Sequence, residues 1–451
     1  MEKSVSITVK FLSLNIFDFT KFAYSLLTLK PLFTIMRRLS FLLLVFLTGF
    51  GLSMAQVTVS GVVCENGGKK KLPGVSLSVE GSNIGTVSNA DGAFSLRIPA
   101  EFASGRIVAE QLGYFTRTIS ADSVLALNGK CIIRLEPTGR LLGEVVVRGG
   151  KPAEIVEQAL SRIPRNYSPN RNRFSAFYRE TIQKGRRYTS VSEAIVDVIK
   201  EPYDRRDIYG ERVQIRKGRK ILSQNSKDTL SVKLVGGPML PVALDFVKNV
   251  DALFDVDFLT LYSFKMENPV SLDDRLHYVI RFFPKAVVSY PLNSGLLYID
   301  QESLAFTKAE FEMDMSDKPK VIHALLRKKP RGLRFKPREM SYVVTYRLVD
   351  GVSYINYIRA SSRFNCDWKR RLFSSGYTTN AEMVMVDRVE NPQEGISRKS
   401  SFRSGDIFDD KVARYWDDNF WLDYNIIEPT ESLEKAVGKL LKKKARIVSA
   451  L

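Results

Sequence analysis

The histidines are the first residues to examine for chemistry, because imidazole is a common ligand of catalytic zinc. The chain contains two, His277 and His323. A catalytic zinc site usually takes three protein ligands, and the motifs His-x-x-Glu and His-Glu-x-x-His bring two of them together. Here the third residues after the histidines are Ile280 and Leu326. The sequence therefore argues against a zinc peptidase, and we interpret both histidines as structural. We expect no metal and no cofactor.

Nucleophilic catalysis needs a serine or cysteine close to a base. The sequence has no Gly-x-Ser-x-Gly motif, and two histidines leave few candidate bases. Cys366 follows Arg363 at a short distance, and a basic neighbour lowers a thiol pKa, but no histidine is near it in the sequence. We interpret Cys366 as a packed thiol. We predict no catalytic residues and a protein that is not an enzyme.

Pairs of carboxylates are the remaining catalytic possibility, since glycosidases need only two acids at a fixed separation. The candidates are Asp273-Asp274, Asp409-Asp410 and Asp417-Asp418. Each pair is flanked by Arg or Lys in a polar stretch, which is typical of solvated surface charge. The aromatic stretch 415–421 either stacks on a sugar or fixes the C-terminal helix to the rest of its domain, and we favour the second interpretation.

The N-terminal region has the features of a secretory signal peptide. Met36-Arg37-Arg38 precedes an apolar run of 14 residues, Leu39 to Leu52, and Ser53-Met54-Ala55 ends it with small residues. A transmembrane helix needs about 20 apolar residues. We expect a start at Met36, a non-native leader before it, and cleavage before Gln56. An uncleaved signal anchor is the alternative, and no cysteine follows the run as a lipoprotein anchor would require.

The charge indicates the kind of partner. The full chain carries a net charge of +19, and removal of residues 1–55, with six basic and two acidic residues, leaves +15. An exported basic protein favours anionic surfaces such as membranes, lipid head groups or acidic glycans, and we expect no nucleic acid partner. Solubility alone is the other explanation. Of the three cysteines, Cys64 and Cys131 fall in one predicted domain, and a disulfide between them remains open.

The sequence predicts a small β-sandwich in residues 56–150. Short strands with turn signals between them are predicted at Val57–Val63, Val75–Val79, Thr86–Ser88, Ala93–Ile98, Arg106–Gln111, Thr116–Ser120, Cys131–Leu135 and Glu144–Val147. Asp91-Gly92 is a dipeptide typical of hairpin turns, and Phe94, Leu96 and Ile98 alternate after it as one buried strand face.

Four stretches of this domain resemble a known family: Leu72 to Leu77, Gly85 to Ile98, Leu112-Gly113-Tyr114 and Leu142 to Val147. Together they are similar to the carboxypeptidase regulatory-like domain, a transthyretin-like sandwich. The resemblance implies a non-catalytic domain at the front of an exported bacterial protein. Similar modules precede TonB-dependent transporters, which implies an adaptor role in the cell envelope.

Residues 151–451 begin with a helix near Pro152 and continue as long alternating strands. We predict strands at Phe174–Gln183, Tyr188–Ile199, Phe258–Glu267, Leu276–Phe283, Gly295–Asp300, Ala305–Met315, Tyr342–Leu348, Val352–Ser361 and Ala381–Arg388. We predict turns at Gly185-Arg186-Arg187, Gly218-Arg219-Lys220 and Asp350-Gly351, and a more helical segment at Pro241–Phe254. The helix expected at Thr430–Arg446 either docks on its own domain or lies on an anionic membrane.

The fold class is therefore mainly β: a transthyretin-like sandwich followed by an α+β domain with a large curved antiparallel sheet and a few helices. Ser294 to Phe306 is similar to a hairpin of LolA-like lipoprotein carriers. That resemblance implies an open half-barrel that holds acyl chains on its concave face. Phe177 to Glu180 and Trp421 to Pro429 resemble C-terminal regions of exported proteins with the same front module, which have no settled activity.

Three functions remain open at this point. The first is a non-enzymatic protein of the periplasm or outer membrane of a Gram-negative bacterium, which binds a lipid, an outer-membrane component or another envelope protein. The second is an envelope hydrolase that uses carboxylates of the second domain, and the third is an adhesin or scaffold. A continuous apolar cavity in the second domain would favour the first, and a cleft with paired acids the second.

Overall fold

The computed structural model describes residues 56–126, 128–138, 150–223, 230, 232–234, 236–249, 252–253, 257–272, 275–369, 374–417 and 424–448. Residues contact one another mainly within two units, Met1–Gln56 and the compact unit Val57–Leu451. The second unit contains every element named below. The predicted leader, signal peptide and strand Glu144–Val147 lie outside the described residues. No helix in the described part of the chain has the length and hydrophobicity to cross a membrane.

The first part of the compact unit is the predicted β-sandwich. One sheet has the order β4 (Ala93–Ile98), β1 (Val57–Glu65), β7 (Lys130–Leu135), and the other the order β3 (Gly85–Val87), β2 (Ser76–Val79), β5 (Arg106–Glu110), β6 (Arg117–Ser120). The short helices η1 (Ala100–Phe102) and α2 (Ala121–Leu125) join strands. Alternating side chains from both sheets fill the core, among them Val59, Leu77, Phe94, Leu96 and Ile98.

The Asp91-Gly92 turn differs from the prediction, because it joins two sheets and is not a hairpin. The strand before it, β3, pairs with β2, whereas β4 after it pairs with β1. Gly92 has φ +71°, and a Cβ there would lie 2.5 Å from the carbonyl oxygen of Val63. Asn89 Oδ1 accepts from the backbone N–H groups of Asp91 and Ala93 at 2.9 Å each. The dipeptide therefore makes a tight crossover between sheets that only glycine accommodates.

The three cysteines are free. Cys131 lies opposite Gly61 in the β1–β7 ladder, whereas Cys64 lies opposite Arg134. The two thiols therefore occupy different positions along the paired strands, and the disulfide left open above is not formed.

The second part is built on one antiparallel sheet of ten strands. Its order is β10 (Arg212–Leu222), β9 (Arg187–Lys200), β8 (Asn172–Lys184), β19 (Ser375–Glu390), β18 (Val352–Trp368), β17 (Leu333–Val349), β15 (Phe306–Met313), β14 (Asn293–Asp300), β13 (Arg275–Pro284), β12 (Tyr262–Leu272). β8 pairs with β19, with Tyr178 opposite Met383, so the first and last long strands meet in the middle of the sheet. The mainly β fold class is confirmed.

Two of the three predicted turns are confirmed, and one is wrong. Gly185 (φ +58°) and Gly351 (φ +81°) lie in the turns that join β8 to β9 and β17 to β18. Gly218, by contrast, lies inside β10, a strand that the sequence did not reveal. A Cβ at Gly218 would lie 2.5 Å from Val412 Cγ2, so this glycine allows a helix to approach the strand closely, and its flanking basic residues mimic a turn.

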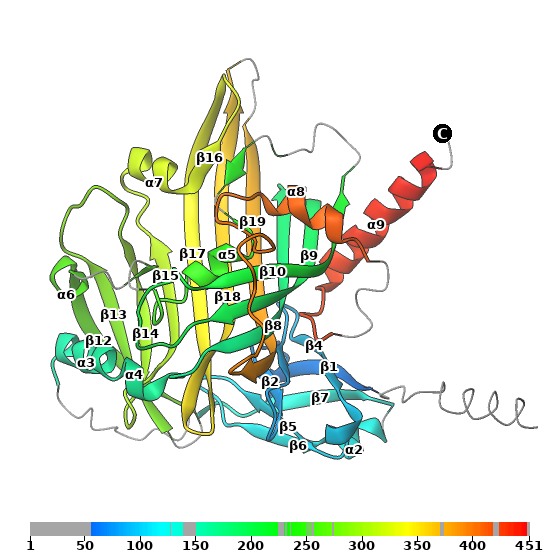
Figure 1. The fold of residues 1–451 in the computed structure, drawn as a ribbon, viewed down its shortest axis with the longest axis vertical. Coiled ribbons are helices and arrows are strands. Elements are labelled where there is room, and N and C mark those ends of the chain that lie inside the picture. The colour runs from blue at the N-terminus through cyan, green and yellow to red at the C-terminus, as the bar shows by residue number, and fades with distance from the viewer. Residues whose placement is uncertain are drawn as a thin grey trace, which may run out of the picture. The chain divides into compact units, whose positions relative to one another are not determined.

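The two faces of the large sheet are covered by different elements. The inner face, defined by the side chains of Tyr178, Ala194 and Val344, carries the main core. It packs against α3 (Pro152–Ser161), α4 (Ile163–Asn166), α5 (Met239–Ala243), α7 (Lys318–Leu325) and α8 (Phe408–Val412), and the shorter elements α6 (Phe258–Leu261), β11 (Lys233–Leu234), β16 (Leu326–Lys328) and η5 (Ala413–Tyr415) lie near its margins (Figure 1).

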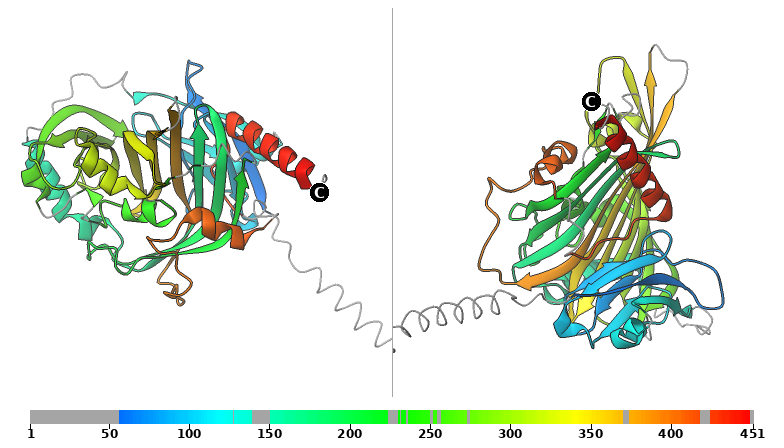
Figure 2. Two further views of the ribbon diagram at one scale, coloured as in Figure 1. Left: turned by 90° about the horizontal axis from the view of Figure 1, so that it is seen from above. Right: turned by 90° about the vertical axis from the view of Figure 1, so that its right-hand side faces the viewer.

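The outer face, defined by Phe177, Ile195, Tyr357 and Val384, meets the sandwich and the segment around Ile426 and Ile427. The C-terminal helix α9 (Glu431–Val448) packs on β9 and β10, where Leu433 contacts Val191 and Ile221. Figure 2 shows α8 and α9 on opposite sides of these strands. The helix therefore docks on its own domain, which is one of the two interpretations left open above.

Candidate ligand cavity on the inner face

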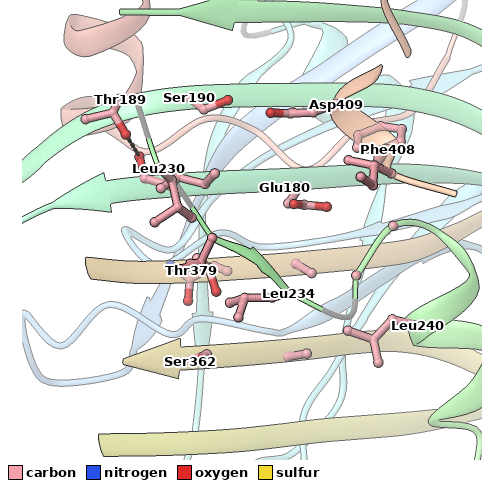
Figure 3. Close-up of a pocket in the computed structure, with 18 of the residues that line it drawn as sticks. Glu180, Thr189, Ser190, Leu230, Leu234, Leu240, Ser362, Thr379, Phe408 and Asp409 are labelled. Atoms are coloured by element: carbon pink, nitrogen blue, oxygen red, sulfur yellow. Dashed lines mark hydrogen bonds between the residues drawn. The ribbon is translucent and has the colours of Figure 1, made fainter. Parts of the chain in front are cut away.

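A cavity of about 220 Å³ lies on the inner face of the sheet. Its floor comes from β8, β9, β10, β17, β18 and β19. Its cover comes from described residues between Leu230 and Leu240 and from Asp406–Asp409 (Figure 3). Strand alternation aims every second side chain of the floor into this space. The cavity therefore exists because a curved sheet is covered by chain segments rather than by a second sheet.

Much of the lining is apolar. Six of the apolar side chains that border the cavity are Ile182, Leu230, Leu234, Leu325, Met340 and Phe408. Phe408 is fixed by an edge-to-face contact with Tyr178, whose ring centroid lies 4.9 Å away. Ala360 and Ala381 on β18 and β19 leave room where larger residues would fill the space. The lining can hold a hydrocarbon chain.

Two carboxylates border the same cavity. Asp409 accepts a hydrogen bond from Ser192 Oγ at 2.7 Å, and Lys220 Nζ donates to its carbonyl oxygen at 2.8 Å and lies 3.5 Å from its Oδ2. Glu180 accepts from the Tyr178 hydroxyl at 2.9 Å. Burial raises the pKa of Tyr178 far above its ordinary value, so this hydroxyl remains a donor. The cavity thus has acceptor groups held in fixed positions beside its apolar walls.

Two serine hydroxyls in the cavity are buried and unpaired. Ser190 on β9 and Ser362 on β18 are each 4% exposed, and both line the cavity. Neither Oγ has a hydrogen-bond partner among the described residues. An unpaired buried hydroxyl costs about 1–3 kcal/mol, so a water molecule or a ligand in the cavity would stabilise it. Figure 3 places both serines around the same space as Glu180 and Asp409.

Among the described residues, the candidate catalytic acids, histidines and cysteine lie apart from this cavity, except one. Asp409 borders it, whereas its neighbour Asp410 is exposed. Asp417 pairs with Lys217 at 3.1 Å, and Asp273, Asp274 and Asp418 lie outside the described residues. No acid pair predicted from adjacent positions therefore faces a common space within the described residues.

The histidines and Cys366 are also far from a catalytic arrangement. His277 is fully buried on β13, where its Nδ1 lies 3.1 Å from the carbonyl oxygen of Arg275, and His323 is exposed on α7. Burial, together with Asp367, raises the pKa of the Cys366 thiol to about 11, so the thiol is protonated and packed in an apolar cluster. Among the described residues, no group of three His, Cys, Asp or Glu side chains is placed to hold a metal ion.

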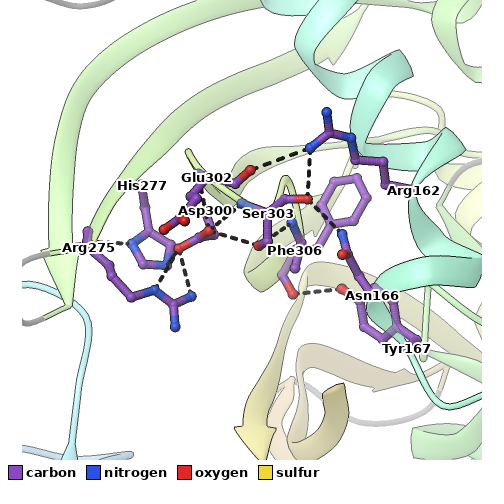
Figure 4. Close-up of polar contacts among 10 residues, drawn as sticks. Arg162, Asn166, Tyr167, Arg275, His277, Asp300, Glu302, Ser303 and Phe306 are labelled. Carbon is purple, nitrogen blue, oxygen red and sulfur yellow. Dashed lines mark hydrogen bonds and ion pairs between the residues drawn. The ribbon is translucent and has the colours of Figure 1, made fainter. Parts of the chain in front are cut away.

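The predicted hairpin Ser294–Phe306 is present as β14 and β15, and its turn is anchored by polar contacts (Figure 4). Asp300 accepts from the backbone N–H and hydroxyl of Ser303 at 2.8 Å each and from Arg275 Nη2 at 2.7 Å. Asn166 donates to the Ser303 carbonyl at 3.0 Å, and the Tyr167 hydroxyl donates to that of Phe306 at 2.8 Å. The hairpin turn is thus attached to α4 as a structural element.

A buried ionic cluster, which the sequence did not indicate, lies elsewhere on the inner side. Lys200 Nζ lies 2.8 Å from both Glu211 Oε2 and Asp245 Oδ2, and all three side chains are at most 1% exposed. Asp245 also accepts from the hydroxyls of Tyr203 and Tyr346 at 2.7 Å each. Burial raises the pKa of Glu211 to about 7 in spite of the nearby Lys200. Lys200, Glu211 and Asp245 do not line the inner cavity. The cluster joins the end of β9 to the segments before β10 and after α5, so it holds the fold together.

The outer face holds the C-terminal segment against the sandwich through a second buried network. Arg179 Nε donates to Glu193 Oε1 at 2.6 Å, and its Nη2 donates to the Ile427 carbonyl at 2.8 Å. From the sandwich, Thr86 Oγ1 donates to the Ile426 carbonyl at 2.9 Å, and Asn89 Nδ2 donates to that of Glu428 at 3.1 Å. The stretch that contains the Asp91-Gly92 turn is therefore the surface on which the C-terminal segment is fixed.

The aromatic stretch 415–421 is described only to Asp417. Trp416 is 44% exposed and bridges to Gly218 of β10, and η5 packs on the same strand. The described part of this stretch therefore attaches the chain to the edge of the sheet, and the remainder lies outside the described residues.

Comparisons with known proteins agree with the first part of this description. Residues 59–147 match the CarboxypepD_reg-like domain family, which confirms the predicted regulatory-like domain. A comparison with curated proteins found no match.

Two solved structures are similar to the chain at a low score. A DUF1329 family protein from Desulfovibrio piger is 12% identical, with a TM-score of 0.24 over 55% of this chain and 96% of that one. A putative outer membrane lipoprotein-sorting protein domain from Vibrio parahaemolyticus is 13% identical, with a TM-score of 0.24 over 58% of this chain and 98% of that one.

Proposed function

We propose that this protein is an exported, non-enzymatic component of a Gram-negative cell envelope, and that its inner cavity binds a lipid-like ligand. In this proposal, residues 56–150 form a regulatory-like domain and residues 151–451 the ligand-binding domain. The observation that carries it is the pair of unpaired, buried hydroxyls of Ser190 and Ser362 inside a largely apolar cavity. Such an arrangement suits a molecule with a hydrocarbon part and a polar head.

The chemistry of the lining limits the head group. Ser190 and Ser362 can donate or accept, whereas the Glu180 and Asp409 carboxylates only accept. Lys220 is already occupied by Asp409, so an anionic head would meet little free positive charge among the described lining residues. We therefore expect a neutral or amine-bearing head with hydroxyl or amide groups.

The test is to identify what the protein carries and then to close the cavity. The full-length protein, purified from the envelope without detergent exchange, should show a bound amphiphile at near-stoichiometric level in native mass spectrometry. Ala360→Phe, which places a ring into the cavity, should remove this species while the protein stays folded. A wild-type protein with no bound amphiphile, or an Ala360→Phe variant that retains it at the wild-type level, would contradict the proposal.

A hydrolase is the second candidate, because Glu180 and Asp409 border one space. Each carboxylate already accepts a hydrogen bond from a neighbouring side chain, which suits a binding role. Glu180→Gln and Asp409→Asn decide between the two. If the co-purified amphiphile accumulates in its intact form only in these variants, and a cleaved form is found in the wild type, the protein is a hydrolase and the non-enzymatic proposal is wrong.

A further inference from the structure

A second cavity, of about 420 Å³, lies on the outer face of the large sheet. Its walls come from the sandwich, at Ser76 and Gln111 for example, and from β13, β15, β17 and β18. The sheet separates it from the inner cavity, because Ser362 and Ala360 of β18 face one side and Tyr357 and Arg359 the other. The two cavities are therefore distinct sites.

Three residues that line this outer cavity each have a buried polar atom without a hydrogen-bond partner among the described residues: Nε2 of His277, Nη1 of Arg347 and Oε1 of Gln111. His277 is 0% exposed. Because its Nδ1 lies 3.1 Å from the Arg275 carbonyl, Nδ1 is the donor and Nε2 carries the lone pair. The nearest carboxylate oxygen, Asp300 Oδ2, is 3.8 Å from Nε2, beyond hydrogen-bond range (Figure 4).

The charges of the outer cavity are unevenly paired. Arg275 is neutralised by Asp300 at 2.7 Å, and Lys308 by Glu310 at 2.6 Å. Arg347 has no carboxylate within ion-pair distance among the described residues, and its Nη2 donates to the Asn83 carbonyl at 3.1 Å. Burial lowers the pKa of this guanidinium and outweighs the opposite effect of Glu110, which acts from further away, although an arginine stays protonated. An anionic group in the cavity would pair with Nη1 of Arg347.

We propose that the outer cavity binds an acidic saccharide. Its carboxylate would accept from Arg347 Nη1, and its hydroxyls would donate to His277 Nε2 and Gln111 Oε1, the two unpaired acceptors. Further hydroxyls can donate to Glu110 and Glu382 on the same walls. Hydroxyl groups suit this lining because each one both donates and accepts, and the cavity offers donors and acceptors on several sides. This site is independent of the lipid-like ligand proposed above.

The chain offers a precise reporter, because it has two histidines and they lie in different places. We would titrate the full-length protein with digalacturonate and follow the imidazole signals by NMR, with His323→Gln for assignment. The His277 signal should shift in a saturable way, and the exposed His323 signal should stay unchanged. Maltose, a neutral disaccharide, should bind at least about tenfold more weakly, since it lacks the charge-assisted hydrogen bond to Arg347.

Arg347 has a matched control on the same face. Arg347 and Arg388 both donate to Asn83 of the sandwich, at 3.1 and 3.0 Å, but only Arg347 lines the outer cavity. Arg347→Gln should weaken digalacturonate binding by about tenfold to a hundredfold in calorimetry, while Arg388→Gln should leave it unchanged. The proposal is overturned if wild type does not bind digalacturonate, if maltose binds equally well, if both variants lose affinity equally, or if an acidic tripeptide shifts His277 and the saccharide does not.

Discussion

Two sets of buried polar side chains on the inner side of the same sheet differ in whether they have partners. In the ionic cluster, Lys200 Nζ lies 2.8 Å from a carboxylate oxygen of Glu211 and of Asp245, which makes two ion pairs although Nζ and Glu211 Oε2 are not in regular hydrogen-bond geometry. The hydroxyls of Tyr203 and Tyr346 donate to Asp245. Ser190 and Ser362 are 4% exposed and line the inner cavity, but their hydroxyls have neither an ion pair nor a hydrogen-bond partner among the described residues.

This difference distinguishes buried polar residues that stabilise the fold from buried polar residues that can bind a ligand. Buried polar groups are normally paired, so a paired cluster without adjacent space is explained by folding alone. An unpaired hydroxyl at the wall of a cavity can complete its hydrogen bonding with a water molecule or a ligand in the cavity. Each prediction below changes one side of this comparison and has its own control.

The largest loss of stability is expected when the ionic cluster loses the carboxylate of Asp245. Asp245→Leu removes one of the two carboxylates of Lys200 and the acceptor of the Tyr203 and Tyr346 hydroxyls. Loss of one partner in a buried pair costs about 3–5 kcal/mol of unfolding free energy. Urea denaturation measures it, and Glu431→Gln, at the exposed pair with Lys435, is the control that should show no change. Equal stability of the two variants would refute the structural role.

The pH dependence of stability should carry the signature of Glu211. Its pKa is raised from 4.5 to about 7, so the native state holds this proton more tightly than the unfolded chain does. The contribution is fully present below pH 4.5 and is lost as the pH rises to about 7, which amounts to about 3 kcal/mol.

The measurement is the urea midpoint at intervals from pH 4.5 to 7.5 in wild type and Glu211→Gln. The variant should lose this downward slope, because a glutamine does not titrate. Asp300 does not interfere, because its pKa is lowered from 3.8 and its contribution is lost only at lower pH. Identical slopes in the two proteins would show that Glu211 does not titrate in this range.

A pair of alanines tests whether the cavity is a true void. Ala309 is fully buried in the main core, whereas Ala360 lines the cavity. Ala309→Phe should overpack the core and cost about 1–3 kcal/mol. Ala360→Phe should cost less than that, because its ring enters free space. Thermal and urea unfolding compare the two, and an Ala360→Phe penalty as large as that of Ala309→Phe would mean that the cavity is closed in solution.

The smallest effect on stability, with the opposite sign, is expected at the unpaired hydroxyls. Ser190→Ala and Ser362→Ala each remove a buried group without a partner, so the ligand-free protein should gain up to about 1 kcal/mol. The same changes should lower the amount of co-purified amphiphile. Ser192→Ala, which removes a paired hydroxyl that donates to Asp409, is the matched control and should lose stability. A loss of stability in all three variants would remove the distinction between paired and unpaired serines.

Much of the fold follows from local patterns. The alternation after Asp91-Gly92 predicted β4 with the bounds Ala93–Ile98, and the long alternating runs predicted nine of the ten strands of the large sheet, at least in part. The exception, β10, combines few apolar residues with a glycine and several basic residues, so its pattern resembles a turn. The first four residues of the run Phe258–Glu267 form α6 rather than strand, since a short apolar run does not distinguish the two.

The candidate sites could not be predicted in the same way. Ser190 and Ser362 are ordinary serines in the sequence, and they become informative only because β9 and β18 place them across one cavity. His277, Arg347 and Gln111 come from β13, β17 and the sandwich, and nothing in their spacing brings them together.

The sequence alone thus determined the regulatory-like sandwich, the antiparallel sheet and the scarcity of catalytic histidine, because turn chemistry, strand alternation and residue counts are local properties. The tertiary structure alone decided which polar groups are paired and which lie unpaired in the wall of a cavity. It joined β8 to β19, placed the sandwich and the C-terminal segment on the outer face, and left a cavity on each side. Pairing and void volume depend on residues far apart in the chain, and no local pattern records them.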